Sequence, residues 1–419
     1  MDSHKERTAR MEHKQQMGQS APFGIYRPAS GGSEVTFRRG VPNRATIAIG
    51  IVAAAWCVSV VYMAAQSPAD RGMLAGEAFK NVQAMKDVPV DDFLTSMGLM
   101  CAALGNDCAD CHQDAGTQYV DWAADTPRKR TARRMVTMVN TINKDNFGGR
   151  VVVTCWTCHR NRDKPETTPT MDVMYGEPLV GHDDVIVQRP GAPSAASILD
   201  KYLTAIGGVD RLSQVTSYVA TATSVGFGGF GGGGKVQIYA QAPDKRTTII
   251  QFPEAVGRGD STRSFNGSEG WIRTPLSVLG EYKLRGTELD GAKFDALIGF
   301  PQQIKEILTN LRVSTAPPID GKAVQVVQGE GPNRLLVSLY FDTQSGLLTR
   351  MIRYGRTPIG PIPTQVDFAE YHDVSGTKMP FRWTFSWLDG RESFQISDVK
   401  TNVPIDRNRF EKPSTAIQP

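Results

Sequence analysis

Residues 45–65 form an uninterrupted apolar run of 21 positions without a charged side chain. As a helix rising about 1.5 Å per residue, such a run crosses a hydrocarbon core of roughly 30 Å. Eight Lys and Arg residues precede the run, whereas the twenty residues after it hold only Arg71 and Lys80. Because positive charge stays on the cytoplasmic side, the pattern predicts a single-pass anchor in a bacterial inner membrane, with the following chain in the periplasm.

The segment before this run, residues 1–44, is polar and aperiodic, and we expect it to be a flexible cytoplasmic leader. A cleaved signal peptide is the alternative to an anchor. It is the less favoured one because the leader is long and because residues 63–65, Met-Ala-Ala, fit the small-x-small cleavage pattern poorly.

After the apolar run, hydrophobic residues recur at steps of three and four, the period of helices that pack one face against a core. One such stripe covers residues 90–104 and ends at Gly105, as is typical after a helix C-terminus. A second helix is predicted to begin at Thr126 and to stop before Gly148. We therefore predict a mainly α-helical domain over residues 66–176.

Beyond a Pro-rich linker at residues 177–195, which is expected to wrap the helical domain, the hydrophobic period changes to two. After one short helix, alternating segments are separated by turn pairs such as Asn266-Gly267, and they predict an antiparallel β domain over residues 196–419. The clearest segments are residues 235–240, 246–251, 335–340 and 384–388. The Gly-rich run 226–234 fits a hairpin loop better than a phosphate loop, because no Gly-Lys-Ser/Thr follows it.

Composition narrows the functional classes. The 419 residues are 40% hydrophobic and 21% charged, which excludes a disordered, collagen-like or polytopic membrane protein. The net charge of +4, from 47 basic and 43 acidic residues, does not favour bulk nucleic-acid binding. Six cysteines are too few for a disulfide scaffold, but four of them lie in two identical patterns.

Residues 108–112 and 155–159 both read Cys-x-x-Cys-His, the attachment pattern of c-type haem. Two thiols at this spacing can add to the two vinyl groups of one porphyrin, and the adjacent histidine then reaches the iron. The sequence thus predicts two covalently attached haems. The predicted attachment residues are Cys108, Cys111 and His112 for the first haem, and Cys155, Cys158 and His159 for the second.

Three other interpretations of the cysteine motifs are weaker. A structural zinc site would need a gap between Cys pairs of about 15–20 residues, shorter than that between Cys111 and Cys155. A thioredoxin-like redox pair needs a βαβ setting, which neither motif has. Disulfides are possible, yet they give no reason for a histidine after both motifs.

A low-spin haem iron needs a sixth ligand, and methionine raises the potential relative to a second histidine. Met97 lies on the apolar stripe eleven residues before Cys108 and is the preferred ligand of the first haem, with Met100 as core filler or alternative. Met135 and Met138 lie on the helix before the second motif, and we choose Met135 between them.

A basic cluster lies between the two motifs. Such a run is usually a solvated helix face, but it could also neutralise haem propionates or attract an acidic partner. Its members are Arg128, Lys129, Arg130, Arg133 and Arg134.

Residues 77–176 resemble the cytochrome c subunit of photosynthetic reaction centres. The resemblance rests on a Met-containing helix, on Leu-Gly-Asn-Asp before the first motif, on Thr-Pro-Arg opening a long helix with Arg-Met-Val and Asn, and on Arg after the second motif. Family members carry four haems, three with Met and one with a second His as sixth ligand, and this chain matches only the C-terminal pair. The resemblance places Met97 at a family ligand position and leaves Met135, Met138, a distant histidine such as His182 or a partner chain for the second haem.

The C-terminal domain is weakly similar to the half-barrel of lipoprotein-carrier domains, a curved antiparallel sheet around helices. Such a sheet could hold an acyl chain or a quinone, although a packed docking module is favoured because no polar constellation converges in the sequence. The predicted fold class is therefore multidomain, with a single N-terminal transmembrane helix, a mainly α diheme cytochrome c domain, and an α+β domain with a curved sheet.

The predicted function is electron transfer by a membrane-anchored diheme cytochrome c that is not an enzyme. Its partners would be redox proteins, such as a reaction centre or a respiratory complex, and not nucleic acid. Two alternatives stay open: a peroxidase-like diheme enzyme, which needs a releasable iron position, and a lipid or lipoprotein carrier with an accessory haem domain.

Overall fold

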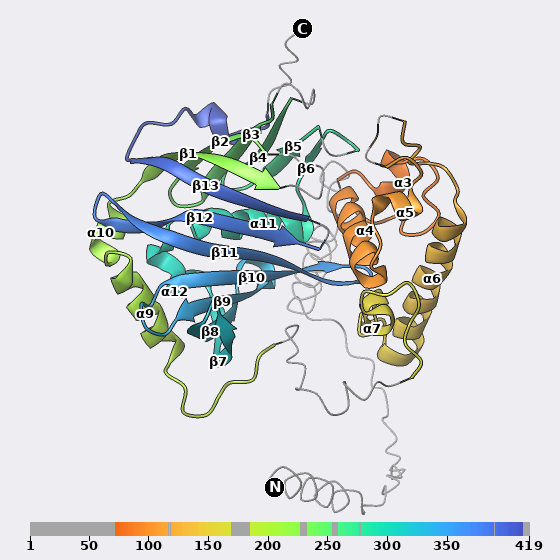
Figure 1. Ribbon diagram of the computed structural model, residues 1–419, viewed down its shortest axis with the longest axis horizontal. Helices are drawn as coiled ribbons and strands as arrows, with labels where there is room; N and C mark the ends of the chain where they lie inside the picture. Colours follow the sequence, from red (N-terminus) through yellow and green to blue (C-terminus); the bar gives the residue numbers. More distant parts are fainter. Residues whose placement is uncertain are drawn as a thin grey trace, which may run out of the picture. The chain divides into compact units, whose positions relative to one another are not determined.

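The computed structural model describes residues 72–115, 117, 119–168, 185–226, 233–253, 259–275, 278–388 and 390–413, all within one compact unit that begins at residue 68 (Figure 1). In these ranges, five helices lie in the part of the chain before residue 169, and the part from residue 185 onward holds two more helices and then thirteen strands with further helices between them. The first five are α3 (Ala75–Ala78), α4 (Val90–Leu104), α5 (Cys108–Cys111), α6 (Pro127–Phe147) and α7 (Cys155–His159).

In the described ranges, no helix combines the length and the apolar composition that a bilayer crossing requires. The predicted fold class is therefore wrong in its transmembrane helix, and the inner-membrane, single-pass localisation derived from it is wrong as well. Helix α6 has 21 residues, but most of the residues in its first two turns are Lys or Arg. The leader 1–44 and the apolar run 45–65 lie outside the described residues.

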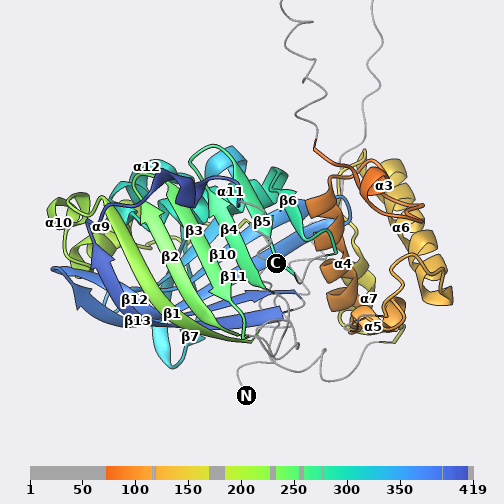
Figure 2. The ribbon, with the colours of Figure 1, turned by 90° about the horizontal axis from the view of Figure 1, so that it is seen from above.

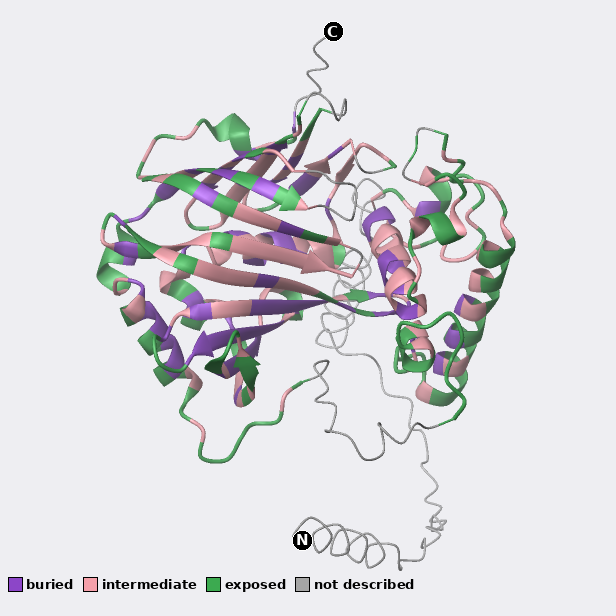
Figure 3. Cartoon of the chain, in the orientation of Figure 1, coloured by how far each residue is buried: buried purple, intermediate pink, exposed green. Residues whose placement is uncertain are grey.

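The two long helices end where the sequence predicted. Helix α4 is followed by Gly105 in the left-handed region at φ 66°, and a Cβ there would lie 2.7 Å from the carbonyl oxygen of Asn161. Helix α6 begins after Thr126, whose side chain accepts a hydrogen bond from the Lys129 amide, and is followed by Gly148 at φ 62°. Figure 3 shows α6 as a mostly exposed helix with a narrow buried stripe.

The β domain is one antiparallel sheet whose strand order is β6-β5-β4-β3-β2-β1-β13-β12-β11-β10-β9-β8-β7. The first and last strands of the chain pair at its centre, with Tyr218 opposite Thr401. The predicted strands and the Asn266-Gly267 turn are confirmed. The strands are β1 (Ser217–Gly226), β2 (Lys235–Gln241), β3 (Lys245–Gln251), β4 (Asp260–Phe265), β5 (Gly270–Arg273), β6 (Glu281–Lys283), β7 (Thr309–Ile319), β8 (Lys322–Glu330), β9 (Leu336–Asp342), β10 (Leu348–Thr357), β11 (Gly360–Val374), β12 (Thr377–Trp387) and β13 (Gly390–Thr401).

The sheet is strongly curved (Figure 2). Helix α11 (Gly286–Leu297) contacts both β3 and β10, which are far apart in the strand order, so the sheet bends around this helix. The main core lies on the same side. It joins α9 (Ala195–Ala205), α11 and α12 (Ile304–Ile307) to the strands through fully buried side chains such as Leu199, Phe294 and Ile304.

Two further sets of contacts join the linker and the helices to the sheet. The linker was expected to wrap the helical domain, but its described part lies on the sheet: the Ile186 amide donates to Gln328 Oε1 at 2.8 Å, and the Arg189 amide to the Val313 carbonyl at 2.9 Å. The β10–β11 hairpin packs against the helices instead, where Ile359 and Ile362 share a buried cluster with residues of α4 and α6.

Candidate functional site

The first cysteine motif is a single helical turn with a reciprocal cap. Asp107 precedes α5, and its Oδ1 atom accepts from the amides of Ala109 (2.8 Å) and Asp110 (3.2 Å). In return, the carboxylate of Asp110 accepts from the Asp107 amide at 2.9 Å. This capping box fixes Cys108 and Cys111 one turn apart on the same helix.

The second motif repeats this construction. Thr154 precedes α7, its hydroxyl accepts from the Thr157 amide at 3.3 Å, and Thr157 Oγ1 accepts from the Thr154 amide at 3.0 Å. In both motifs, the two capping residues directly precede the two cysteines. They are Asp107 and Asp110 in the first motif, and Thr154 and Thr157 in the second. These capping residues are a further sequence signal for the helical turn, in addition to the Cys-x-x-Cys-His pattern.

The His159 ring is oriented by the turn that follows it. Its Nδ1 atom lies 3.0 Å from the carbonyl oxygen of Arg162, and an N–H at Nδ1 that donates there leaves Nε2 with its lone pair for a metal. Arg160 and Asn161 both have positive φ, and the Asn161 amide donates to the Ala103 carbonyl at 2.8 Å. The end of the second motif is thereby attached to the end of α4.

His112 lies in a more enclosed setting. Its ring meets the Trp122 ring edge-on at a centroid distance of 4.9 Å. Burial, and secondarily the positive charge of Lys129, lower the pKa of His112 to about 4, although the Trp122 backbone opposes this. The buried Nδ1 atom forms no hydrogen bond of normal geometry with the described residues. The imidazole is therefore neutral at pH 7, the form that coordinates iron.

Helix α6 holds both motifs, one at each end. At its start, Thr126 Oγ1 donates to the Cys111 carbonyl at 3.0 Å. Near its end, the buried side chain of Asn143 donates to the Val153 carbonyl at 2.7 Å and accepts from the amides of Val152 (3.0 Å) and Val153 (2.9 Å). Sequence reasoning missed Asn143, although it is the one polar residue on the stripe of Val136 and Val139.

The candidate methionines differ in their surroundings. Met100 packs with the buried cluster around Leu99, as a core residue does. Met97 is half-buried, follows Phe93 by one helical turn on α4, and is not among the residues of that cluster. On α6, Met135 is half-buried whereas Met138 is 44% exposed. His182 lies outside the described residues.

The side chains of the basic cluster form ion pairs and hydrogen bonds with nearby residues. Arg128 pairs with Asp163 at 3.0 Å, and Asp125 pairs with Arg130 and Arg133. Lys129 Nζ donates to the carbonyls of Trp122 (2.9 Å) and Ala124 (2.8 Å), which fixes the loop that places Trp122 against His112. Most of these side chains therefore order the segment before α6. The exposed side chain of Arg134 donates to Thr131 on its own helix.

The residues present fit a c-type haem. The thiols of Cys111, Cys155 and Cys158 are free, so no disulfide closes either motif. Across the described part of the chain, no three His, Cys, Asp or Glu side chains gather as a structural zinc site would require. A haem iron needs only one or two protein ligands, because the porphyrin supplies the other four.

A second candidate site lies in the β domain. Contrary to the expectation that no polar constellation converges there, the curved sheet brings Arg353 and Asp295 together at 3.0 Å inside an apolar cavity. Arg353 comes from β10 and Asp295 from α11. No local pattern signals this pair, because the two residues lie 58 positions apart.

Residues 33–184 match the family model of the photosynthetic reaction centre cytochrome C subunit, which confirms the resemblance drawn from the motifs. This match supports a cytochrome-like electron-transfer role with a haem cofactor and redox partners. No curated protein sequence matches the chain.

Solved structures similar to the chain include a LolA superfamily protein from Nitrosomonas europaea, with 16% identity and a TM-score of 0.36, covering 53% of this chain and 99% of that one. A DUF1329 family protein from Desulfovibrio piger has 9% identity and a TM-score of 0.34, covering 52% and 98%.

Proposed function

We propose that this protein is a diheme c-type cytochrome that transfers electrons between redox proteins. The observation that carries the proposal is the duplicated construction of the two Cys-x-x-Cys-His turns, each closed by a reciprocal capping box and both attached to α6. A bound haem would supply a one-electron redox centre to each motif.

The chain's own residues would hold and shield these centres. Cys108 and Cys111 would bind the first haem covalently, and Cys155 and Cys158 the second. His112 and His159 would be the proximal ligands, and Arg162 would keep His159 in the tautomer that presents Nε2. Met97 and Met135 are the proposed distal ligands, since both are half-buried on the helix that precedes their motif.

We infer that residues 66–176 form the diheme domain, that 177–195 link it to the next domain, and that 196–419 form the β domain. Attachment of both motifs to one helix supports a fixed spacing between the two centres. A fixed spacing suits a protein that passes electrons on without binding a substrate at the iron.

The test is haem stoichiometry. The full chain, produced together with a cytochrome c maturation system, should contain two covalently bound haems by pyridine haemochrome analysis. The double variant Cys108→Ala, Cys111→Ala and the matched variant Cys155→Ala, Cys158→Ala should each retain one. A colourless protein, or pigment that acidified acetone extracts, would reject the proposal.

A further inference from the structure

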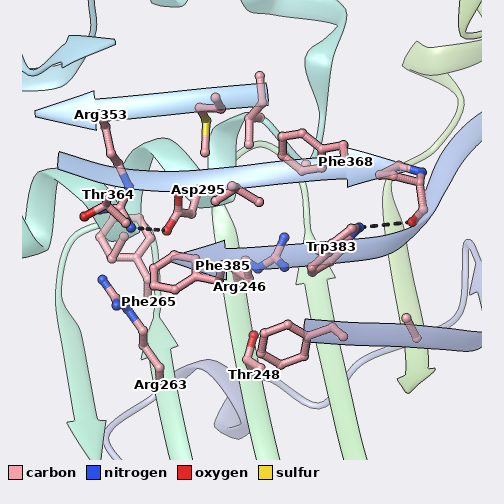
Figure 4. A pocket seen from close by; sticks show the side chains of 18 of the residues that line it. Arg246, Thr248, Arg263, Phe265, Asp295, Arg353, Thr364, Phe368, Trp383 and Phe385 are labelled. Carbon is pink, nitrogen blue, oxygen red and sulfur yellow. Dashed lines mark hydrogen bonds and ion pairs between the residues drawn. The ribbon is translucent and has the colours of Figure 1, made fainter. Parts of the chain in front are cut away.

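The concave side of the sheet encloses a cavity of about 510 Å³, a volume typical of small-molecule sites. Strands from both halves of the sheet line it, together with helix α11 (Figure 4). Leu94, Thr95 and Gly98 of α4 also line it, so the cavity is bounded by the helix that carries Met97.

Aromatic side chains form much of the cavity wall. Figure 4 shows Phe368, Trp383 and Phe385 beside one another, with Arg246 near Trp383. The Arg246 guanidinium lies 4.9 Å from the centre of the Trp383 ring, and the Arg353 guanidinium 5.8 Å from that of Phe385. Flat aromatic and guanidinium surfaces favour a flat ligand, because planar groups stack on them over a large area.

Polar atoms without hydrogen-bond partners in the described structure also belong to residues that line the cavity. Four of the buried side-chain atoms that make no hydrogen bond in the described structure belong to cavity-lining residues: Arg353 Nε, Asp295 Oδ1, Gln302 Oε1 and Glu392 Oε1. Arg353 is only 3% exposed, and its ion pair with Asp295 uses just one nitrogen and one oxygen. Buried donors and acceptors are costly when unpaired, and these atoms are one donor and three acceptors, so they fit a ligand with hydroxyl groups, which both accept and donate.

We propose that the cavity binds a ring of the quinone class, as quinone or as hydroquinone. A ring hydroxyl can accept from Arg353 Nε and donate to Asp295 Oδ1, two atoms of the same ion pair. An acyl chain has no polar atom along its length and would leave both unpaired.

This inference rests on the proposed function, since it names a small-molecule partner for an electron-transfer protein. The ligand would touch one face of α4, and Met97 lies on the neighbouring side of that helix. The occupied cavity and the first cysteine motif would therefore share one structural element.

The experiment is anaerobic titration calorimetry of the full chain with menadione, its hydroquinone menadiol, and oleate. Menadiol and menadione should bind saturably at one site, and oleate should not. Thr364→Phe, which fills the cavity opposite Arg353 in the strand register, should weaken binding of both ring compounds at least tenfold. Thr384→Phe on β12, which is outside the cavity lining, is the matched control and should leave binding unchanged.

Asp295→Asn sharpens the test. In this variant, the side-chain amide oxygen must face the Arg353 guanidinium. The amide NH2 group then takes the place of the Oδ1 acceptor. Menadiol, which donates to that acceptor, should lose about tenfold in affinity, whereas menadione should lose less. Circular dichroism of each variant checks folding, and Thr364→Phe tests the site if Asp295→Asn is unfolded.

Three results would overturn the inference: no saturable binding of either ring compound, saturable binding of oleate alone, or ring binding that Thr364→Phe leaves unchanged. Haem content is measured in the same samples. Protein with two haems and no quinone binding refutes only the cavity assignment, whereas ring binding by protein without covalent haem refutes the proposed function and leaves the cavity assignment intact.

Discussion

The Oδ2 atom of Asp91 accepts a hydrogen bond from the backbone amide of Arg285 at 2.6 Å and thereby joins α4 to the segment that precedes α11. Asp91 is 4% exposed, and burial raises its pKa to about 6 despite this bond. Burial, followed by the charges of Asp91 and Glu288, raises the pKa of the neighbouring Asp92 to about 7. Three acidic side chains thus share the contact between α4 and α11.

Because of this cluster, we expect the free energy of unfolding to fall as pH rises. Both carboxyl pKa values lie above the ordinary value of 3.8, so the folded state binds protons more tightly than the unfolded state does. The resulting stabilisation is complete below about pH 4 and is lost as pH rises through 6 and 7. Asp92→Asn removes one of the two groups and should raise the free energy of unfolding at pH 8 by on the order of 1 kcal/mol, allowing for its partial exposure.

Urea unfolding at pH 5 and pH 8 provides the measurement. Asp92→Asn should narrow the difference between the two pH values, whereas the exposed Asp145→Asn on α6 should leave it as in the parent chain. An equal pH dependence in all three proteins would show that the contact between α4 and α11 does not titrate in this range.

Asn143 should be important for the segment before the second motif. Asn143→Ala removes three hydrogen bonds to the backbone of residues 152 and 153 and should lower the free energy of unfolding by about 2 kcal/mol. Asn146→Ala on the same helix removes one exposed bond to the Ile142 carbonyl and should cost about 0.5 kcal/mol or less. Equal unfolding midpoints for the two variants would argue that Asn143 does not hold this segment.

The elements that could be predicted from the sequence are those fixed by local chemistry. Gly105 and Gly148 ended their helices as expected, because a left-handed residue after a helix is a local requirement. The Cys-x-x-Cys-His motifs could likewise be recognised from the sequence. The pair of Arg353 with Asp295 and the bond of Asp91 to Arg285 depend on which strands and helices meet after the sheet curves, and no short-range pattern encodes that.

Gly360 marks where the β10–β11 hairpin meets the helices. A Cβ at this position would lie 2.8 Å from Leu99 Cδ2 and 3.0 Å from Thr154 Cγ2, so Gly360→Ala forces the hairpin away from the second motif. Gly321→Ala is a matched control: Gly321 also has positive φ, but its Cβ would meet nothing within 4 Å. Gly360→Ala should therefore cost about 1–3 kcal/mol more than Gly321→Ala in chemical unfolding. Similar losses would mean that the hairpin yields without strain.

The reduction potential of the first haem can show whether Met97 is its distal ligand or an ordinary core methionine. If its sulfur is the distal ligand, Met97→His should retain both covalent haems and lower one potential by on the order of 100 mV, because a second imidazole stabilises the oxidised iron. Met73→His, at a methionine that is 57% exposed, should leave both potentials unchanged. Spectroelectrochemical titration of the parent and the two variants resolves the two haems in one experiment. A titration of Met97→His that superimposes on that of the parent would remove Met97 from the ligand set and leave it as packing on the half-buried side of α4.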